Sequence, residues 1–134
     1  MLLLGIDIGT SFVKASVADA DTKQIIASAS YPETETPIIS KRSGWAEQSP
    51  EMWWDHTVQV IKKLINSGTI DGKDIRAIGI AYQMHGLVVV DKWQKPLRDA
   101  IIWCDSRSVD IGNRAERILG QDVCTTHLLN APGN

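Results

Sequence analysis

Residues 2–31 contain three apolar, β-branched segments that are separated only by short polar turns. These segments are Leu2–Ile8, Phe12–Ala18 and Gln24–Tyr31. Strands joined by such short connections pair antiparallel, because a parallel pair needs a crossover of about a dozen residues or more. The pattern therefore predicts an antiparallel three-stranded meander at the start of the chain.

A helix is predicted after a long polar loop over residues 32–44. Ser49-Pro50-Glu51 combines an N-cap residue, a first-turn proline and a first-turn acid. A hydrophobic face at helical spacing follows, and Gly68 ends the helix. That face consists of Trp54, Val58, Ile61 and Ile65.

The remaining apolar runs predict three more strands and one more helix. The strands are expected at Ile75–Ala81, Leu87–Val90 and Ala100–Trp103. Asp105 or Ser106 is expected to cap the helix, which ends at Gly120 with Ile111, Ala115 and Ile118 facing inward. This order predicts an α/β fold with a mixed sheet flanked by helices.

Composition excludes several classes of protein. The 134 residues contain 14 Lys and Arg against 16 Asp and Glu, so no basic excess is available to neutralise a nucleic-acid backbone. No stretch of about 18 apolar residues and no basic leader are present, which argues against a membrane span and a signal peptide. Cys104 and Cys124 are expected to be free thiols, with Cys104 in the core, and the protein is expected to be cytoplasmic.

The first candidate site is the string Gly5-Ile6-Asp7-Ile8-Gly9-Thr10-Ser11. Gly9 allows a close backbone approach to an anion, and Thr10 and Ser11 add hydroxyl groups beside the turn amides. Asp7 supplies the hard oxygen that Mg²⁺ prefers. The alternative is a plain β-turn with an Asp cap.

Two further strings carry polar side chains that suit a polyhydroxylated ligand. Trp45 and Glu47 precede the first helix, and Gln83-Met84-His85 interrupts an apolar run before Gly86. Gln and His both donate and accept hydrogen bonds, and a Trp face can support a sugar ring. The alternatives are a structural bulge with a buried His and a Trp that only packs.

The fourth string is Trp103-Cys104-Asp105-Ser106-Arg107. Asp105 and Arg107 follow a predicted strand, and the carboxyl ends of strands collect ligand groups in α/β sheets. The alternative is an N-cap Asp beside a solvated Arg.

In their order along the chain, these strings together resemble the N-terminal part of the FGGY carbohydrate kinases. The resemblance implies a ribonuclease-H-like, actin-related fold of two lobes, with residues 1–134 as an incomplete first lobe. It also implies ATP and Mg²⁺ as cofactors, with Asp7 at the metal and Gly9, Thr10 and Ser11 at the phosphates. Gln83, Met84 and His85 match the string that contacts the sugar, and Trp45, Glu47, Asp105 and Arg107 match positions near it.

Within the family, Gln83–Gly86 is most similar to the xylulose kinases, so D-xylulose is the expected substrate. Ribulose, glycerol and gluconate are alternatives, as is a non-catalytic sugar- or nucleotide-binding module. The family's catalytic base, an Asp late in the first lobe, and its adenine-binding residues are expected downstream of this chain, so no catalytic residue is assigned here. The expected partners are the sugar and ATP, with no nucleic acid or membrane. A homodimer is a further hypothesis, because an incomplete lobe exposes apolar surface.

Overall fold

The computed structural model describes residues 1–133, and Asn134 lies outside the described residues. The chain forms two compact units. The first unit comprises residues 1–37 and 49–83, and the second comprises residues 38–48 and those from 84 onward.

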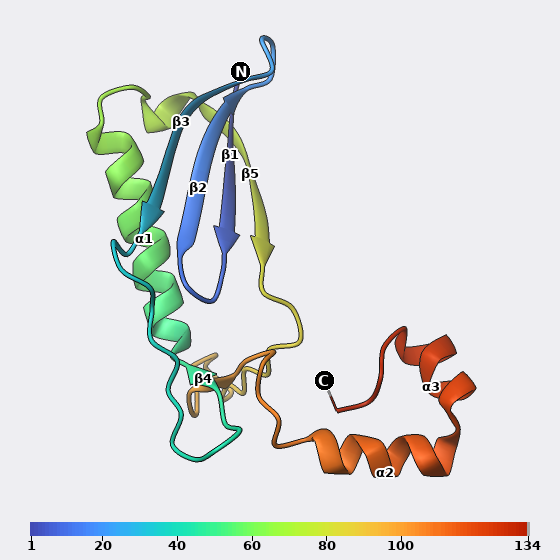
Figure 1. The fold of residues 1–134 in the computed structure, drawn as a ribbon. Coiled ribbons are helices and arrows are strands. Elements are labelled where there is room, and N and C mark those ends of the chain that lie inside the picture. Colours follow the sequence, from blue (N-terminus) through green and yellow to red (C-terminus); the bar gives the residue numbers. More distant parts are fainter. Residues whose placement is uncertain (134) are drawn as a thin grey trace. The chain divides into compact units, whose positions relative to one another are not determined.

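A four-stranded sheet in the order β3-β2-β1-β5 forms the first unit (Figure 1). Its strands are β1 (Leu2–Ile8), β2 (Val13–Asp19), β3 (Gln24–Tyr31) and β5 (Ile75–Tyr82). The first three strands pair antiparallel, whereas β5 runs parallel to β1. The predicted meander and the predicted mixed sheet are both confirmed.

Helix α1 (Pro50–Asn66) lies along one face of this sheet (Figure 1). Its start is as predicted: the Ser49 side chain accepts a hydrogen bond from the Met52 amide, and Pro50 is the first helical residue. The core between helix and sheet is apolar. It consists of Leu4, Ile6, Val13, Ala15, Val17, Val60, Leu64 and Ile70.

The predicted packing face of α1 is wrong by about one residue. Val60 is 0% exposed and faces the sheet, whereas Trp54 is 71% exposed. Thr57 lies on the buried stripe because its hydroxyl donates to the Trp53 carbonyl oxygen at 2.7 Å, so a polar residue can be buried there. Of the four residues of the predicted face, only Ile61 packs against the core.

The second unit contains short strands and two helices. Strand β4 (Glu47–Gln48) pairs antiparallel with β6 (Ala100–Ile101). Helices α2 (Val109–Leu119) and α3 (Gln121–Leu128) follow, with Gly120 between them at a φ of 91°. The 3₁₀ turn η1 (Gly72–Asp74) belongs to the first unit and precedes β5.

Several sequence predictions fail in the second unit. Leu87–Val90 forms no strand: Leu87 and Val90 each make only an isolated bridge, to Ile101 and Pro96. The cap of α2 is Ser108 rather than Asp105 or Ser106, and α3 was not predicted.

The predicted inward face of α2 is also wrong. Ile111 and Ile118 are largely exposed, while Gly112 is buried. A side chain at Gly112 would collide with the Pro132 carbonyl oxygen, so the helix packs closely against the backbone of residues 132–133. Backbone proximity, rather than an apolar stripe, therefore decides which face of α2 is covered.

Cys104 and Cys124 are both free, but Cys104 is exposed and Cys124 is buried. The predicted core role of Cys104 is therefore wrong, and Cys124 fills the core position instead. Within residues 1–133, the helices are all too short or too polar to cross a bilayer.

Candidate functional site

The turn after β1 is closed by its own backbone. The Gly9 amide donates to the Phe12 carbonyl oxygen at 3.1 Å. A Cβ atom at position 9 would lie 2.9 Å from that same oxygen, so the turn has room only for glycine. The Ser11 carbonyl oxygen accepts from the Thr36 amide at 2.9 Å, which fixes the far side of the turn.

The same turn is joined to the end of β5. The Thr10 hydroxyl donates to the Gln83 side-chain oxygen at 3.0 Å, and the Gln83 amide donates to the Ile8 carbonyl oxygen at 3.0 Å. Both contacts follow from the parallel pairing of β1 with β5, which brings the carboxyl ends of the two strands together. The structure thus places Gln83, from the predicted sugar string, beside the predicted phosphate turn.

Asp7 lies one step earlier on β1 and points to the open side of the sheet. Its cross-strand neighbours are Lys14 and Ala81, and all three line a shallow hollow of about 600 Å³. Asp7 is exposed. Residues 1–133 contain no group of three His, Cys, Asp or Glu side chains that could hold a metal ion. A single exposed carboxylate fits Mg²⁺ when waters and phosphate oxygens complete the shell, because Mg²⁺ keeps several waters.

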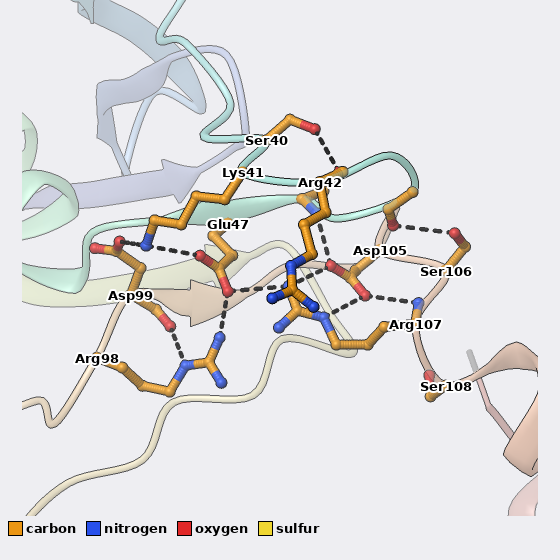
Figure 2. Close-up of polar contacts among 12 residues, drawn as sticks. Ser40, Lys41, Arg42, Glu47, Arg98, Asp99, Asp105, Ser106, Arg107 and Ser108 are labelled. Atoms are coloured by element: carbon orange, nitrogen blue, oxygen red, sulfur yellow. Dashed lines mark hydrogen bonds and ion pairs between the residues drawn. The ribbon is translucent and has the colours of Figure 1, made fainter.

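The second unit holds a network of ion pairs around the buried carboxylate of Glu47, shown in Figure 2. The Glu47 side chain is 1% exposed. Its two oxygens pair with Lys41 at 3.1 Å, with Arg107 at 2.9 Å and with Arg98. Short strand β4 positions Glu47, and its backbone makes two hydrogen bonds to Ile39. This carboxylate is occupied by protein partners.

The Asp105 carboxylate is also bound by protein groups. It accepts from the Ala46 amide at 2.6 Å and from the Arg107 amide at 2.9 Å. The Arg107 guanidinium donates to both Asp105 oxygens, from Nε at 2.8 Å and from Nη2 at 2.7 Å. Such paired bonds are the strongest geometry between arginine and a carboxylate. Asp105 therefore fixes Arg107 and the backbone at Ala46, and it does not cap α2.

Two guanidinium groups lie over the Trp45 ring. The guanidinium carbon of Arg107 lies 3.8 Å from the ring centroid, and that of Arg42 lies 4.9 Å from it. Both distances are within the range of a cation–π interaction. The Trp45 ring, half-buried, thus supports Arg107.

The pKa values reflect this network. Burial raises the pKa of the Glu47 carboxyl, but hydrogen bonds from Arg107 and Lys41 outweigh it, so the pKa lies below its ordinary value. Burial also opposes ionisation of Asp105, yet the hydrogen bonds from Arg107 and Ala46 lower its pKa to about 2. The hydrogen bond to Asp105 raises the pKa of Arg107. All three groups are therefore charged at neutral pH.

A cavity of about 200 Å³ opens next to this network. Polar and aromatic side chains line it together with apolar ones: His85, Leu87, Ile101, Ile102, Trp103, Asp105, Arg107 and Ser108. His85 has a φ of 62° and an exposed side chain, so it is not a buried core histidine. Of the predicted sugar residues, the structure brings His85, Asp105 and Arg107 together here, while Met84 is exposed and lies outside the lining.

Sequence reasoning did not assign Trp103, Arg98 or Lys41 to the site. Trp103 lines the cavity, and its place in the string with Asp105 and Arg107 was the signal. Lys41 and Arg98 are bound to Glu47 across 6 and 51 positions of sequence. Such pairings between distant segments carry no local sequence signal.

The fold places the chain in the class of actin-like kinases. It superposes on a ligand-bound xylulose kinase from Lactobacillus acidophilus with a TM-score of 0.78 and 27% identity, over 93% of this chain and 24% of that one. A gluconate kinase from the same organism gives a TM-score of 0.79 and 26% identity, over 93% of this chain and 24% of that one.

The particular family follows from sequence. Residues 2–129 match the N-terminal domain of the FGGY family of carbohydrate kinases, and the chain belongs to that family. It is 35% identical to the xylulose kinase of Escherichia coli K12 over 133 residues, which cover 98% of this chain and 26% of that protein. The chain thus spans about a quarter of the length of this relative.

Proposed function

We propose that the chain is part of an ATP-dependent kinase that phosphorylates D-xylulose to D-xylulose 5-phosphate. The observation that carries this proposal is its similarity, along nearly its whole length, to a xylulose kinase. That similarity spans the Gln83–Gly86 string. The string's resemblance to the xylulose kinases is what favours D-xylulose over other carbohydrates.

The phosphates are proposed to bind at the turn after β1, in the first unit. Gly9 lets the backbone approach phosphate oxygens, and Thr10 and Ser11 line the turn with hydroxyl groups. Asp7 would hold Mg²⁺ through its carboxylate or through water. When bound, ATP supplies the phosphoryl group, and Mg²⁺ neutralises part of the charge on the phosphates. The hydrogen bond from Thr10 to Gln83 holds the turn beside the end of β5.

The sugar is proposed to bind in the cavity of the second unit. His85 and Arg107 present hydrogen-bonding groups there, and Trp103 presents an aromatic surface. Arg107 stacks on the Trp45 ring and pairs with Glu47, and its hydrogen bonds to Asp105 fix its orientation. Met84 completes the string next to His85. In this proposal His85, Arg107 and Trp103 contact the sugar and orient its terminal hydroxyl group, whose oxygen attacks the phosphoryl group.

The remaining parts of the machinery are proposed to lie outside these residues. In this proposal residues 1–134 belong to the first lobe, and an Asp farther along the parent protein takes the proton from the sugar hydroxyl. The partners are then the sugar and ATP. Self-association of the chain stays a hypothesis.

The test is a substrate panel on the product of the whole gene that encodes this sequence. ADP release would be measured with D-xylulose, D-ribulose, glycerol and D-gluconate at equal concentrations. We expect kcat/KM for D-xylulose to exceed the others by about tenfold or more, the discrimination available from one or two hydrogen bonds. The His85→Ala variant should raise KM for D-xylulose, because it removes a group that would bind the sugar.

A clear preference for glycerol or D-gluconate would contradict the proposed substrate. The gluconate kinase with the same fold makes the aldonate the sharpest competitor. Tight sugar binding without any ADP release by the whole gene product would favour a non-catalytic binding module instead.

A further inference from the structure

Arg107 is the cation of the sugar cavity, and two carboxylates compensate its charge. Asp105 accepts two of its hydrogen bonds and Glu47 accepts a third. Three of the five N–H groups of the guanidinium are thus committed to carboxylates. The side chain is 18% exposed, so solvent screens its charge only in part.

The network around Glu47 balances its charges as a whole. Its cations are Lys41, Arg98 and Arg107, and its carboxylates are Glu47, Asp99 and Asp105. Three positive and three negative groups give a net charge of zero. Arg42 also lies on the Trp45 ring, but it is exposed to solvent.

We propose that Glu47 is a specificity-determining positioning residue, which makes the sugar cavity select an uncharged polyhydroxylated ligand over a sugar acid. Glu47 does not touch the ligand: its oxygens are held by Lys41, Arg98 and Arg107. It acts through Arg107, whose positive charge it cancels together with Asp105. This inference rests on the proposed sugar site.

The physical reason is the cost of moving an anion out of water. A carboxylate that enters the cavity loses hydration and gains no net attraction from a neutral network. A hydroxyl group loses much less, and the guanidinium N–H groups not bound to carboxylates can donate to it. The cavity therefore favours hydroxyl groups without a separate repulsive residue.

The test changes the charge of the network without changing its shape. Glu47→Gln leaves three cations against two carboxylates and keeps the side-chain volume. Asp105→Asn makes the same change on the other side of Arg107 and serves if the first variant does not fold. The control is Glu33→Gln, which removes the same charge from the exposed ion pair with Lys63, outside this network.

Binding of D-xylulose and D-xylonate would be measured on the 134-residue chain by amide and indole NMR shifts, read at His85 and Trp103. The two probes have the same number of carbons, and only D-xylonate is charged. The wild-type chain should bind D-xylulose about tenfold or more tightly than D-xylonate. Glu47→Gln and Asp105→Asn should shift this ratio toward D-xylonate by about tenfold, the size expected of one partly buried charge. Glu33→Gln should leave the ratio unchanged.

Each other outcome is decisive. Wild-type chain that binds D-xylonate as tightly as D-xylulose overturns the inference without any variant. Folded Glu47→Gln or Asp105→Asn with an unchanged ratio overturns it and leaves the sugar site standing. If the wild-type chain binds neither probe and the variants do not bind D-xylonate, both the sugar site and the inference are contradicted.

Discussion

Asp105 joins two segments that are far apart in sequence. Its carboxylate holds the Ala46 amide, which belongs to the loop before α1, and the Arg107 side chain, which follows β6. Both bonds need the ionised carboxylate, because a protonated oxygen accepts more weakly and brings a proton of its own. The stability of the second unit therefore depends on pH through this residue.

We expect the second unit to lose stability in acid, between pH about 4 and pH about 2. The pKa of Asp105 is about 2 in the folded chain and about 3.9 in an unfolded one. A depressed pKa contributes stability that is fully present above the unfolded value and disappears as the pH falls through the folded value. The loss should be on the order of 2 kcal/mol.

Hydrogen exchange of the Ala46 amide measures this loss, because Asp105 accepts from that amide. Its protection factor, referred to the intrinsic exchange rate at each pH, should fall across this range. In Asp105→Asn the protection should already be reduced at neutral pH and should change less with acid. Protection that is constant down to pH about 2 would contradict the assignment.

Gly9 is required by geometry rather than by a positive φ. A methyl group at this position would lie 2.9 Å from the Phe12 carbonyl oxygen, a backbone atom that cannot move away alone. Gly9→Ala should therefore destabilise the first unit by about 1–3 kcal/mol, the usual cost of overpacking. Gly79→Ala on β5 is the matched control, because a methyl group there meets nothing within 4 Å. Urea unfolding measures both; equal losses would contradict the explanation.

At the scale of elements, α1 shows how a sequence pattern can select the wrong face. The apolar residues of this helix form two overlapping stripes, and the fully apolar one contains Trp54 and Ile65. The buried stripe instead includes Thr57, which satisfies its hydroxyl within the helix. Helical spacing alone could not separate the stripes, because the choice depends on how the helix meets β2 and β3.

Two valines on α1 test the assignment with the same substitution. Val60 is fully buried against the sheet, and Val58 is half-buried on the predicted face. Val60→Ala should cost about 2 kcal/mol of stability because it leaves a cavity, and Val58→Ala should cost under about 1 kcal/mol. Thermal or urea unfolding of the two variants gives the comparison. The reverse order of stabilities would restore the face that the sequence predicts.

The secondary structure was predicted well in the first part of the chain and poorly in the last part. Strands β1 to β3 have strong alternation and short turns, so local information determines them. Leu87–Val90 is also apolar and β-branched, yet it makes only isolated bridges, because a strand needs a partner along its length. Gly120 marked the end of α2, but residues 121–128 are too short and too weakly amphipathic for their spacing to indicate helix α3.

At the scale of the whole molecule, the motifs predicted which residues lie together better than which contacts each one makes. His85, Asp105 and Arg107 were grouped from their strings, and they line one cavity. Sequence could not show that Glu47 pairs with three cations or that Arg107 stacks on the Trp45 ring. These contacts form only when folding brings the side chains together. The roles of these residues therefore follow from burial and charge.

The last prediction concerns activity of the chain alone. We expect the 134-residue chain to show no measurable kinase activity with ATP and D-xylulose. It spans about a quarter of the length of the xylulose kinase that it resembles, and no residue in it is assigned as the base that accepts the hydroxyl proton. General-base catalysis and the positioning of both substrates each contribute large factors to phosphoryl transfer, so losing both should remove detectable turnover. A coupled assay for ADP would be run with the purified chain, with a no-protein control and with the whole gene product as the positive control. ADP release that requires D-xylulose and exceeds the no-protein control would overturn the prediction and would mean that residues 1–134 themselves contain a sufficient catalytic site.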